Sequence, residues 1–402
     1  MAFENIKAYT EYLARIRSIN VQVEFSSGLK PVRASLIDSK TLSIQYLDGS
    51  TQSISTNVQL ATSADFLGSA EISFDLKTDS DVSTLTLRIP ATRSPAQLRA
   101  TMGSFSDVLK IPWSASYLRK MAVSPDFRCI ETKDCVIERD CVKIWKDLPS
   151  ENWAEMMDFW HCHKPNDPNP MSGAKSDCSH NKNDECTHLL NDDHGHSHPV
   201  QEAHTKYIDT KFLPSDGSVY IGQSYILVHV TNLSKVIKLE NNFVVCNGNI
   251  IGKMESDTVA KLWKWKLWLE SDNVRTQHEF KSYIFVSSVI EDLISSHAIH
   301  TFVLSNSENN DERLMVWVFN ADISFTNLSN PQATPAFKIF YSTDKAQFQA
   351  LKKTRGEVER VTFPGEVLDN LIVYLEHNTE LMPKLSRRFG LWNVGVLEKY
   401  AV

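Results

Sequence analysis

The stretch Val21-Gln22-Val23-Glu24-Phe25 alternates apolar and polar side chains, which is the pattern of a β-strand with one buried face. The same period of two recurs at 42–46 and at 85–89, and Asp48-Gly49 between them is typical of a hairpin turn. Residues 20 to 110 are therefore predicted to form an antiparallel β unit.

The residues before this unit follow a different period. Between Phe3 and Ile19, the apolar side chains recur at helical spacing, which predicts one amphipathic helix. The first predicted domain, residues 1–110, is this N-terminal helix plus the antiparallel β domain.

The C-terminal part, residues 210–402, mixes both periods and is predicted to be an α+β domain. In Lys261–Leu269 the apolar residues again recur at every second position, so we expect a strand with its lysines on the opposite face. The whole chain is predicted to be α+β and β-rich: an N-terminal antiparallel β domain followed by a mixed α+β domain with a flexible insertion. The further elements expected are helices at 282–295 and 366–376 and strands at 314–319 and 337–341.

The middle of the chain divides into two predicted segments. Residues 111–165 contain a cysteine-bearing strand and then a helix, with Ser150 as its N-cap and Pro165 at its end. Residues 166–209 are rich in His, Asn, Asp and Ser and contain few apolar residues, so they are predicted to be a disordered insertion. The predicted helix carries an apolar stripe that must face a core or a partner, formed by Trp153, Met156, Met157 and Trp160.

Composition excludes several classes of protein. The 402 residues carry a formal net charge of −7, which argues against a protein that binds nucleic acid directly through bulk charge. No window has the roughly 18 apolar residues of a membrane span, and the N-terminus lacks the pattern of a secretory signal. The seven cysteines are unevenly placed, which favours a reducing compartment, so we expect the nucleus and the cytoplasm. Glycine-rich nucleotide loops and the nucleophile elbow of hydrolases are missing, so no nucleotide or organic cofactor is predicted.

One cysteine stands out by its neighbours. Cys162 lies between His161 and His163 and is followed by Lys164, at the end of the predicted Trp-rich helix. Cationic neighbours lower the pKa of a thiol, and the resulting thiolate is both a nucleophile and a soft metal ligand. The alternative is a structural cysteine beside two surface histidines.

A second group of cysteines suggests zinc. Cys129 and Cys135 are separated by five residues, a loosened form of the usual zinc-ligand spacing, and Cys246 is a distant third ligand. Cys246-Asn247-Gly248-Asn249 resembles a zinc-knuckle turn that lacks its second cysteine. The sequence thus predicts a zinc site at Cys129, Cys135 and Cys246 that lacks a fourth ligand. The His-rich run of the insertion is interpreted as a disordered loop.

Two blocks of sequence resemble a known family. Leu148-Pro149-Ser150-Glu151-Asn152-Trp153, followed by Trp160-His161-Cys162-His163-Lys164-Pro165, is similar to the HECT-like ubiquitin-conjugating-enzyme-binding proteins, which are described as ubiquitin-protein ligases. Further similarities run from about residue 55 to the end and include Pro112–Ala115, Tyr220–Ser224 and Cys246–Gly252. The resemblance implies a protein that binds a ubiquitin-conjugating enzyme and promotes ubiquitin transfer. It also implies association with the zinc-dependent endonuclease that cleaves pre-mRNA at the polyadenylation site, and so a role in mRNA 3′-end processing.

The residues limit how literally the family name applies. A HECT mechanism needs a thiol near the C-terminus, but no cysteine follows Cys246. The ligase reading therefore has no C-terminal HECT cysteine, and Cys162, with His161 or His163 as base, is the best candidate for a thioester. The alternative reading is a non-enzymatic assembly factor that caps the zinc nuclease with the Cys162 thiolate. In both readings the Trp153–Pro165 motif binds the partner, through Trp153, Met157, Trp160, Cys162 and His163.

Overall fold

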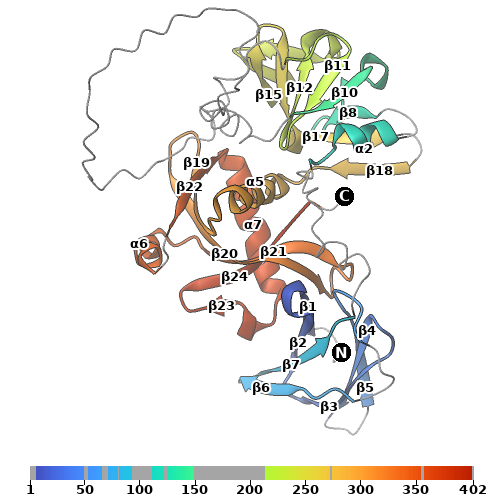
Figure 1. Ribbon diagram of the computed structural model, residues 1–402, viewed down its shortest axis with the longest axis vertical. Coiled ribbons are helices and arrows are strands. Elements are labelled where there is room, and N and C mark those ends of the chain that lie inside the picture. Colours follow the sequence, from blue (N-terminus) through green and yellow to red (C-terminus); the bar gives the residue numbers. More distant parts are fainter. Residues whose placement is uncertain are drawn as a thin grey trace, which may run out of the picture.

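The computed structural model describes residues 6–48, 53–65, 71–79, 81–92, 111–121, 125–148, 213–271, 274–354 and 357–400. Within these ranges most of the regular structure is antiparallel sheet with a few helices, so the predicted α+β, β-rich class is confirmed (Figure 1). The predicted Trp-rich helix and the predicted insertion, 166–209, lie outside the described residues.

The largest sheet joins the two ends of the chain. Its order is β23-β24-β21-β20-β1-β2-β7-β6, with β19 pairing with β20 and β22 with β19. Because β1 pairs antiparallel with both β2 and β20, the N-terminal and C-terminal units share one sheet (Figure 1). The strands are β1 (Lys7–Leu13), β2 (Ser18–Ser26), β6 (Asp75–Asp79), β7 (Val82–Pro90), β19 (Thr301–Asn306), β20 (Glu312–Asn327), β21 (Thr334–Ser342), β22 (Glu359–Phe363), β23 (Arg388–Phe389) and β24 (Trp392–Glu398).

Two further sheets form the part drawn at the top of Figure 1. A seven-stranded sheet has the order β10-β11-β12-β16-β15-β14-β13, and a four-stranded sheet has the order β18-β17-β8-β9. The bounds are β10 (Ile144–Asp147), β11 (Ser218–Ile221), β12 (Tyr225–His229), β16 (Val259–Trp263), β15 (Asn249–Ser256), β14 (Phe243–Cys246), β13 (Ile237–Glu240), β18 (Val274–Glu279), β17 (Leu267–Ser271), β8 (Asp126–Cys129) and β9 (Cys135–Ile137).

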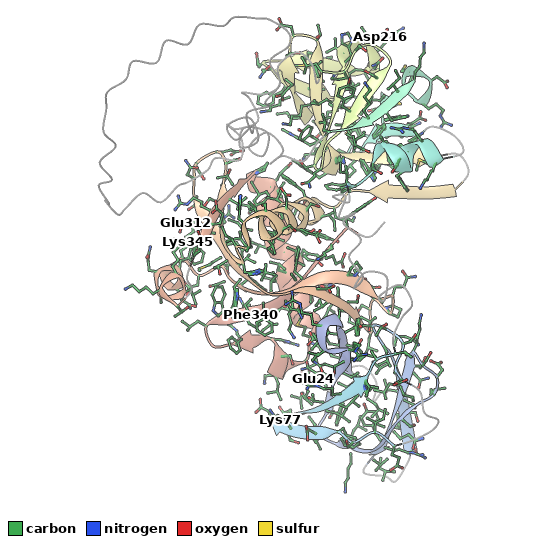
Figure 2. The ribbon with its side chains drawn as sticks, in the orientation of Figure 1. Glu24, Lys77, Asp216, Glu312, Phe340 and Lys345 are labelled. Carbon is green, nitrogen blue, oxygen red and sulfur yellow. The ribbon has the colours of Figure 1, made fainter. Side chains whose placement is uncertain are left out.

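Helices cover the large sheet and connect it to the upper sheets. The predicted helices are confirmed as α5 (Ser282–His297) and α7 (Gly365–Leu381), which pack on each other and on β24. One hydrophobic core runs from the seven-stranded sheet to these two helices. A separate core lies around Phe340, labelled in Figure 2, and includes residues of α6 (Lys345–Lys353). The remaining elements are α2 (Ala115–Lys120) and a three-stranded sheet of β3 (Leu29–Leu36), β4 (Thr41–Asp48) and β5 (Ser53–Gln59).

The helix predicted between Phe3 and Ile19 is wrong. Lys7–Leu13 form the strand β1, followed by a single 3-10 turn at Ala14–Ile16. β1 is an inner strand with both faces covered, since Tyr12 packs into the N-terminal core and Tyr9 into the C-terminal core. A strand that is buried on both faces has no strict polar alternation, and its apolar residues fell by chance at helical spacing.

The strand predicted over Lys261–Leu269 is also interrupted. β16 ends at Trp263, a 3-10 turn spans Lys264–Lys266, and β17 begins at Leu267. The long strand predicted around the cysteines is likewise replaced by the short strands β8, β9 and β10. The predicted strands at 314–319 and 337–341 are confirmed within β20 and β21.

Gly252 marks the closest approach of two strands and gives a first testable prediction. It lies opposite Leu262, and an added Cβ would be 2.2 Å from the carbonyl oxygen of Lys261. Because the obstacle is backbone inside a sheet, we expect Gly252→Ala to lower the free energy of unfolding by about 3 kcal/mol. Urea denaturation measures this, with Gly28→Ala as the control, since its added Cβ would have no neighbour closer than 3.9 Å. Equal stability of the two variants would contradict the prediction.

Candidate functional site

The structure describes the residues that flank the partner-binding motif predicted from sequence, but not the motif itself. Trp153, Met157, Trp160, His161, Cys162 and His163 lie outside the described residues, between Leu148 and Leu213. Leu148 follows β10 and donates a backbone hydrogen bond to Ile221 at 2.8 Å. Both Leu148 and Leu213 pack against the cluster of Tyr225, Leu227 and Val259. The two described residues that flank the segment with the motif therefore lie at one patch of the seven-stranded sheet.

A buried lysine holds the structure beside this patch. Lys264 has no solvent exposure, and its ammonium donates hydrogen bonds to three carbonyl oxygens, those of Pro112, Gly222 (2.5 Å) and Gln223 (3.2 Å). The 3-10 turn after Trp263 is what directs this side chain inward. The segments around Pro112 and around Gly222, both part of the sequence that resembles the family, therefore meet at the ammonium of Lys264.

The charge of Lys264 is set by its surroundings. Burial lowers the pKa of its ammonium, and the nearby carboxylate of Asp147 opposes that effect. Asp147 is also the last residue of β10, and its Oδ1 accepts a hydrogen bond from the backbone of Ala115 at 2.6 Å. Three carbonyl acceptors match the three hydrogens of an ammonium, which favours the protonated form. We call Lys264, Asp147 and these carbonyls the lysine knot.

A groove of about 780 Å³ opens next to the lysine knot, between the seven-stranded sheet and the start of α7. This volume lies within the range of ligand-binding clefts. Phe243 and Ile250 contribute exposed apolar surface to it, with 41% and 44% exposure. Tyr225, which packs beside Leu148, also lines the groove, so Leu148, the last described residue before the motif, contacts a residue of the groove wall.

One wall of the groove is an aromatic stack. The rings of Trp263 and Trp265 are parallel with centroids 5.6 Å apart, and Phe285 continues the stack 5.4 Å from Trp265. Glu366, in the first turn of α7, accepts hydrogen bonds from Trp265 Nε1 and from Lys266 Nζ, both at 2.7 Å. A carboxylate is favourable at a helix N-terminus, so this contact fixes the stack to α7. A rigid aromatic wall with charges at its edge is suited to binding a partner.

The cysteines predicted to bind zinc separate into two places. Cys129 and Cys246 are fully buried, and burial, with a contribution from the nearby Cys129 thiol, raises the pKa of Cys246. Cys135 lies on the other face of the β8–β9 hairpin, opposite Arg128 in the register. The described residues contain no group of three or more His, Cys, Asp or Glu side chains that could hold a metal ion. The zinc site stays a prediction, but these three thiols are not assembled into one ligand set.

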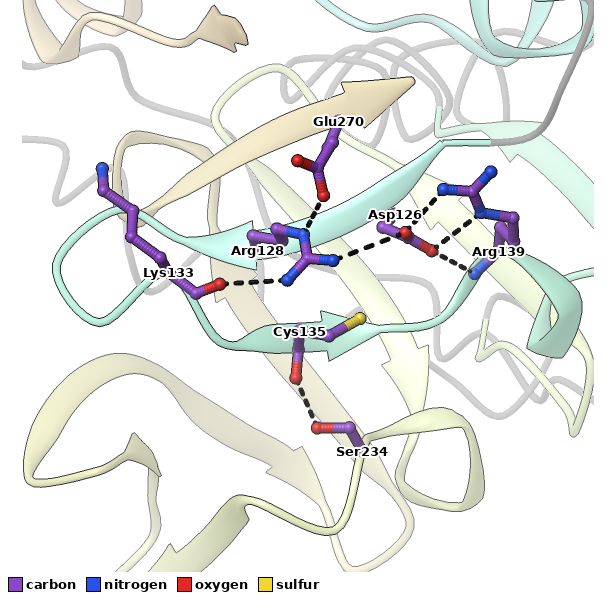
Figure 3. A network of polar contacts seen from close by, with 7 residues as sticks. All are labelled: Asp126, Arg128, Lys133, Cys135, Arg139, Ser234 and Glu270. Atoms are coloured by element: carbon purple, nitrogen blue, oxygen red, sulfur yellow. Dashed lines mark hydrogen bonds and ion pairs between the residues drawn. The ribbon is translucent and has the colours of Figure 1, made fainter. Parts of the chain in front are cut away.

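Cys135 lies beside a network of charged side chains, and its carbonyl oxygen accepts a hydrogen bond from the Ser234 hydroxyl (Figure 3). Arg139 donates to both oxygens of Asp126, at 2.9 Å from its backbone and 2.8 Å from Nη2, and Arg128 pairs with Glu270. Burial acts to raise the pKa of Asp126, but the hydrogen bonds from Arg139 outweigh it and lower that pKa. The network ties β8 to β17, which gives it a structural role.

The thiols in the described part of the chain are poorly suited to nucleophilic attack. Burial, reinforced by the negative charge of Asp126, raises the pKa of Cys135 to about 11. Burial also raises the pKa of Cys141 and of Cys246. Since the thiolate is the reactive form, none of these three is an activated nucleophile at neutral pH.

Sequence reasoning missed the lysine knot and the aromatic stack. The only signal was the repeat Trp263-Lys264-Trp265-Lys266, in which a period of two places both lysines on a solvated face. A single 3-10 turn buries Lys264 instead of leaving it on the solvated face. The carbonyl oxygens that accept hydrogen bonds from its ammonium belong to residues 152 and 42 positions away in the sequence.

Comparison with known proteins shows which family the chain matches. A family model described as HECT-like ubiquitin-conjugating enzyme (E2)-binding matches residues 11–394. An uncharacterized protein of Saccharomyces cerevisiae is 25% identical over 400 residues, covering 97% of this chain and 98% of the relative. An uncharacterized protein of Schizosaccharomyces pombe is 24% identical over 310 residues, covering 74% of this chain and 80% of the relative. No solved structure matches the chain. None of the helices in the described ranges is long and apolar enough to cross a membrane.

Proposed function

The chain belongs to the family of HECT-like ubiquitin-conjugating-enzyme (E2)-binding proteins, and on this basis we propose that it binds a ubiquitin-conjugating enzyme and promotes ubiquitin transfer without a covalent intermediate. The observation that carries the proposal is the extent of the match, from residue 11 to residue 394. In such a mechanism the ligase orients the loaded enzyme, and ubiquitin passes directly to the acceptor lysine.

The distribution of thiols supports a non-covalent mechanism. Residues 247–402 contain no cysteine, so this part of the chain offers no thiol to receive ubiquitin. The raised pKa values of Cys135, Cys141 and Cys246 argue against these thiols as acceptors. Among the other cysteines, Cys162, which lies between two histidines, is the best candidate for a covalent variant of the mechanism.

We propose that the Trp153–Pro165 motif and the groove act together as the binding surface. The segment with the motif is attached through Leu148 and Leu213 to the cluster around Tyr225, and Tyr225 lines the groove. The lysine knot fixes the end of β10, the last described strand before the motif. A partner that contacts the motif is therefore within reach of the aromatic wall. Placing such contacts on a rigid element favours precise recognition.

A discharge experiment tests the proposal. A conjugating enzyme loaded with ubiquitin is mixed with free lysine, with or without the full chain, and the loss of the thioester is followed on non-reducing gels. We expect the chain to accelerate discharge, and Cys162→Ser to accelerate it equally, because positioning needs no thiol on the ligase. Cys141→Ser is the cysteine control, since that side chain is partly exposed and lies in the described part of the chain. A reducible ubiquitin adduct that Cys162→Ser abolishes, together with the acceleration, would establish the covalent mechanism instead.

A second candidate function follows from the neighbours of Cys162. A thiolate flanked by His161 and His163 is a good zinc ligand, so it could enter the open metal site of the pre-mRNA 3′-end cleavage endonuclease and cap it. This function would place the chain in the nucleus as well as the cytoplasm. Native purification with identification of the bound proteins separates the two candidates, since it would recover conjugating enzymes, the nuclease, or both.

A further inference from the structure

Two hairpin loops of the upper sheets face each other across buried thiols. The first loop connects β8 to β9 and starts at Cys129, whose carbonyl accepts a hydrogen bond from Lys133 at 3.0 Å and whose amide donates to Asp134 at 2.9 Å. Lys133 has φ 63°, a left-handed conformation directly after Thr132. The chain therefore folds back tightly, with Thr132 as the fourth residue counted from Cys129.

The second loop connects β14 to β15. Cys246 and Asn249 are directly opposite each other in the register, and Asn247 and Gly248 form the turn with φ of 45° and 87°. Residues that are directly opposite in an antiparallel pair project from the same face. Asn249 therefore shares the face from which Cys246 contacts the first loop.

Hydrogen bonds between short side chains join the two loops. The Thr132 hydroxyl lies 3.3 Å from the Cys246 sulfur, and the Cys129 thiol is close enough to contribute, after burial, to the raised pKa of Cys246. Asn247 Nδ2 donates to Asp134 Oδ2 at 2.6 Å and closes the outer side of the contact. Both cysteines have no solvent exposure.

This arrangement has the spacing of a structural zinc site. Such sites take two ligands from each of two loops, commonly with two residues between the cysteines of a pair. Here the spacing is Cys129-x-x-Thr132 and Cys246-x-x-Asn249, so each loop keeps its first ligand position and has a hydroxyl or an amide at the second. Two thiols cannot complete a tetrahedral shell, and Cys135 lies on the other face of the hairpin.

We infer that the two loops form a latent zinc site, in which Thr132 and Asn249 occupy lost ligand positions and hydrogen bonds hold the loops in place of the metal. The wild-type chain does not bind Zn²⁺ tightly at these loops. Substituting cysteine at only these two positions completes a four-thiolate site. This assignment differs from the set predicted from sequence, since it replaces Cys135 by Thr132.

The test is the full chain with Thr132→Cys and Asn249→Cys. After purification with zinc present, we expect about one equivalent of zinc, with four sulfur ligands at about 2.3 Å in X-ray absorption. The melting temperature of this variant should fall when a chelator removes the metal, whereas that of the wild type should not change. Thr132→Ser with Asn249→Ser is the matched control and should bind no zinc. A double cysteine variant that folds without binding zinc would overturn the inference.

A second measurement does not depend on the folding of that variant. Co²⁺ is titrated into the wild-type chain, and the absorption of cobalt bound by thiolates is recorded. We expect no such absorption, because the wild type offers only two thiols at the loops. A tetrahedral thiolate spectrum that Cys129→Ser removes would show that the wild-type site is complete, and would also overturn the inference.

Discussion

Replacing Lys264 by methionine is expected to lower the free energy of unfolding by about 3–5 kcal/mol, an effect comparable to removing one partner of a buried ion pair. Methionine fills the space of the lysine stem but donates no hydrogen bond. The carbonyl oxygens of Pro112, Gly222 and Gln223 would then be buried without their present donor. Each such unpaired group costs about 1–3 kcal/mol, part of which is recovered because no charge is buried.

Lys266→Met is the matched control for Lys264→Met, because the two lysines lie in the same 3-10 turn. Lys266 is partly exposed and pairs with Glu366 at the surface, so its loss should cost less than about 1 kcal/mol. Chemical denaturation of both variants measures the difference. If the two variants were equally stable, the lysine knot would not organise this part of the fold.

The second large effect is expected in binding. Trp160→Ala should weaken the affinity for a ubiquitin-conjugating enzyme at least about 30-fold, equivalent to about 2 kcal/mol, because truncated tryptophans dominate the energetics of many interfaces. The variant is compared with the wild-type chain by isothermal titration calorimetry. Circular dichroism checks that the β-rich fold is unchanged.

Phe389→Ala is the control for this binding experiment. Phe389 is an aromatic side chain with 54% exposure on β23, at the far edge of the large sheet, and it does not line the groove. The Phe389→Ala variant should bind the conjugating enzyme with the same affinity as the wild-type chain. If Trp160→Ala also bound normally, the motif would not be the partner-binding element.

The fold class was accessible from sequence because several strands alternate apolar and polar side chains. The alternation in 21–25 and 85–89 predicted β2 and β7, and the helices α5 and α7 were expected within a few residues of their observed bounds. β1 was missed for the opposite reason. Its central position covers both faces, so the period of two disappears and only the pairing with β2 and β20 defines it as a strand.

The candidate site was only partly accessible, because its parts are distant in sequence. Cys162 and its histidines are adjacent in the chain, so their chemistry can be argued locally. The groove instead joins Tyr225 to Glu366 through packing that no short motif encodes. The same holds for Thr132, since its role depends on contact with Cys246 in another hairpin.

The most direct test of the central claim is titration of the full chain with a panel of purified ubiquitin-conjugating enzymes. Membership of the E2-binding family and the groove with its exposed apolar side chains predict saturable, one-to-one binding of at least one member. That binding should be lost in Trp160→Ala and kept in Phe389→Ala. Absence of binding to every member of the panel, by a chain that is folded and stable, would contradict the account.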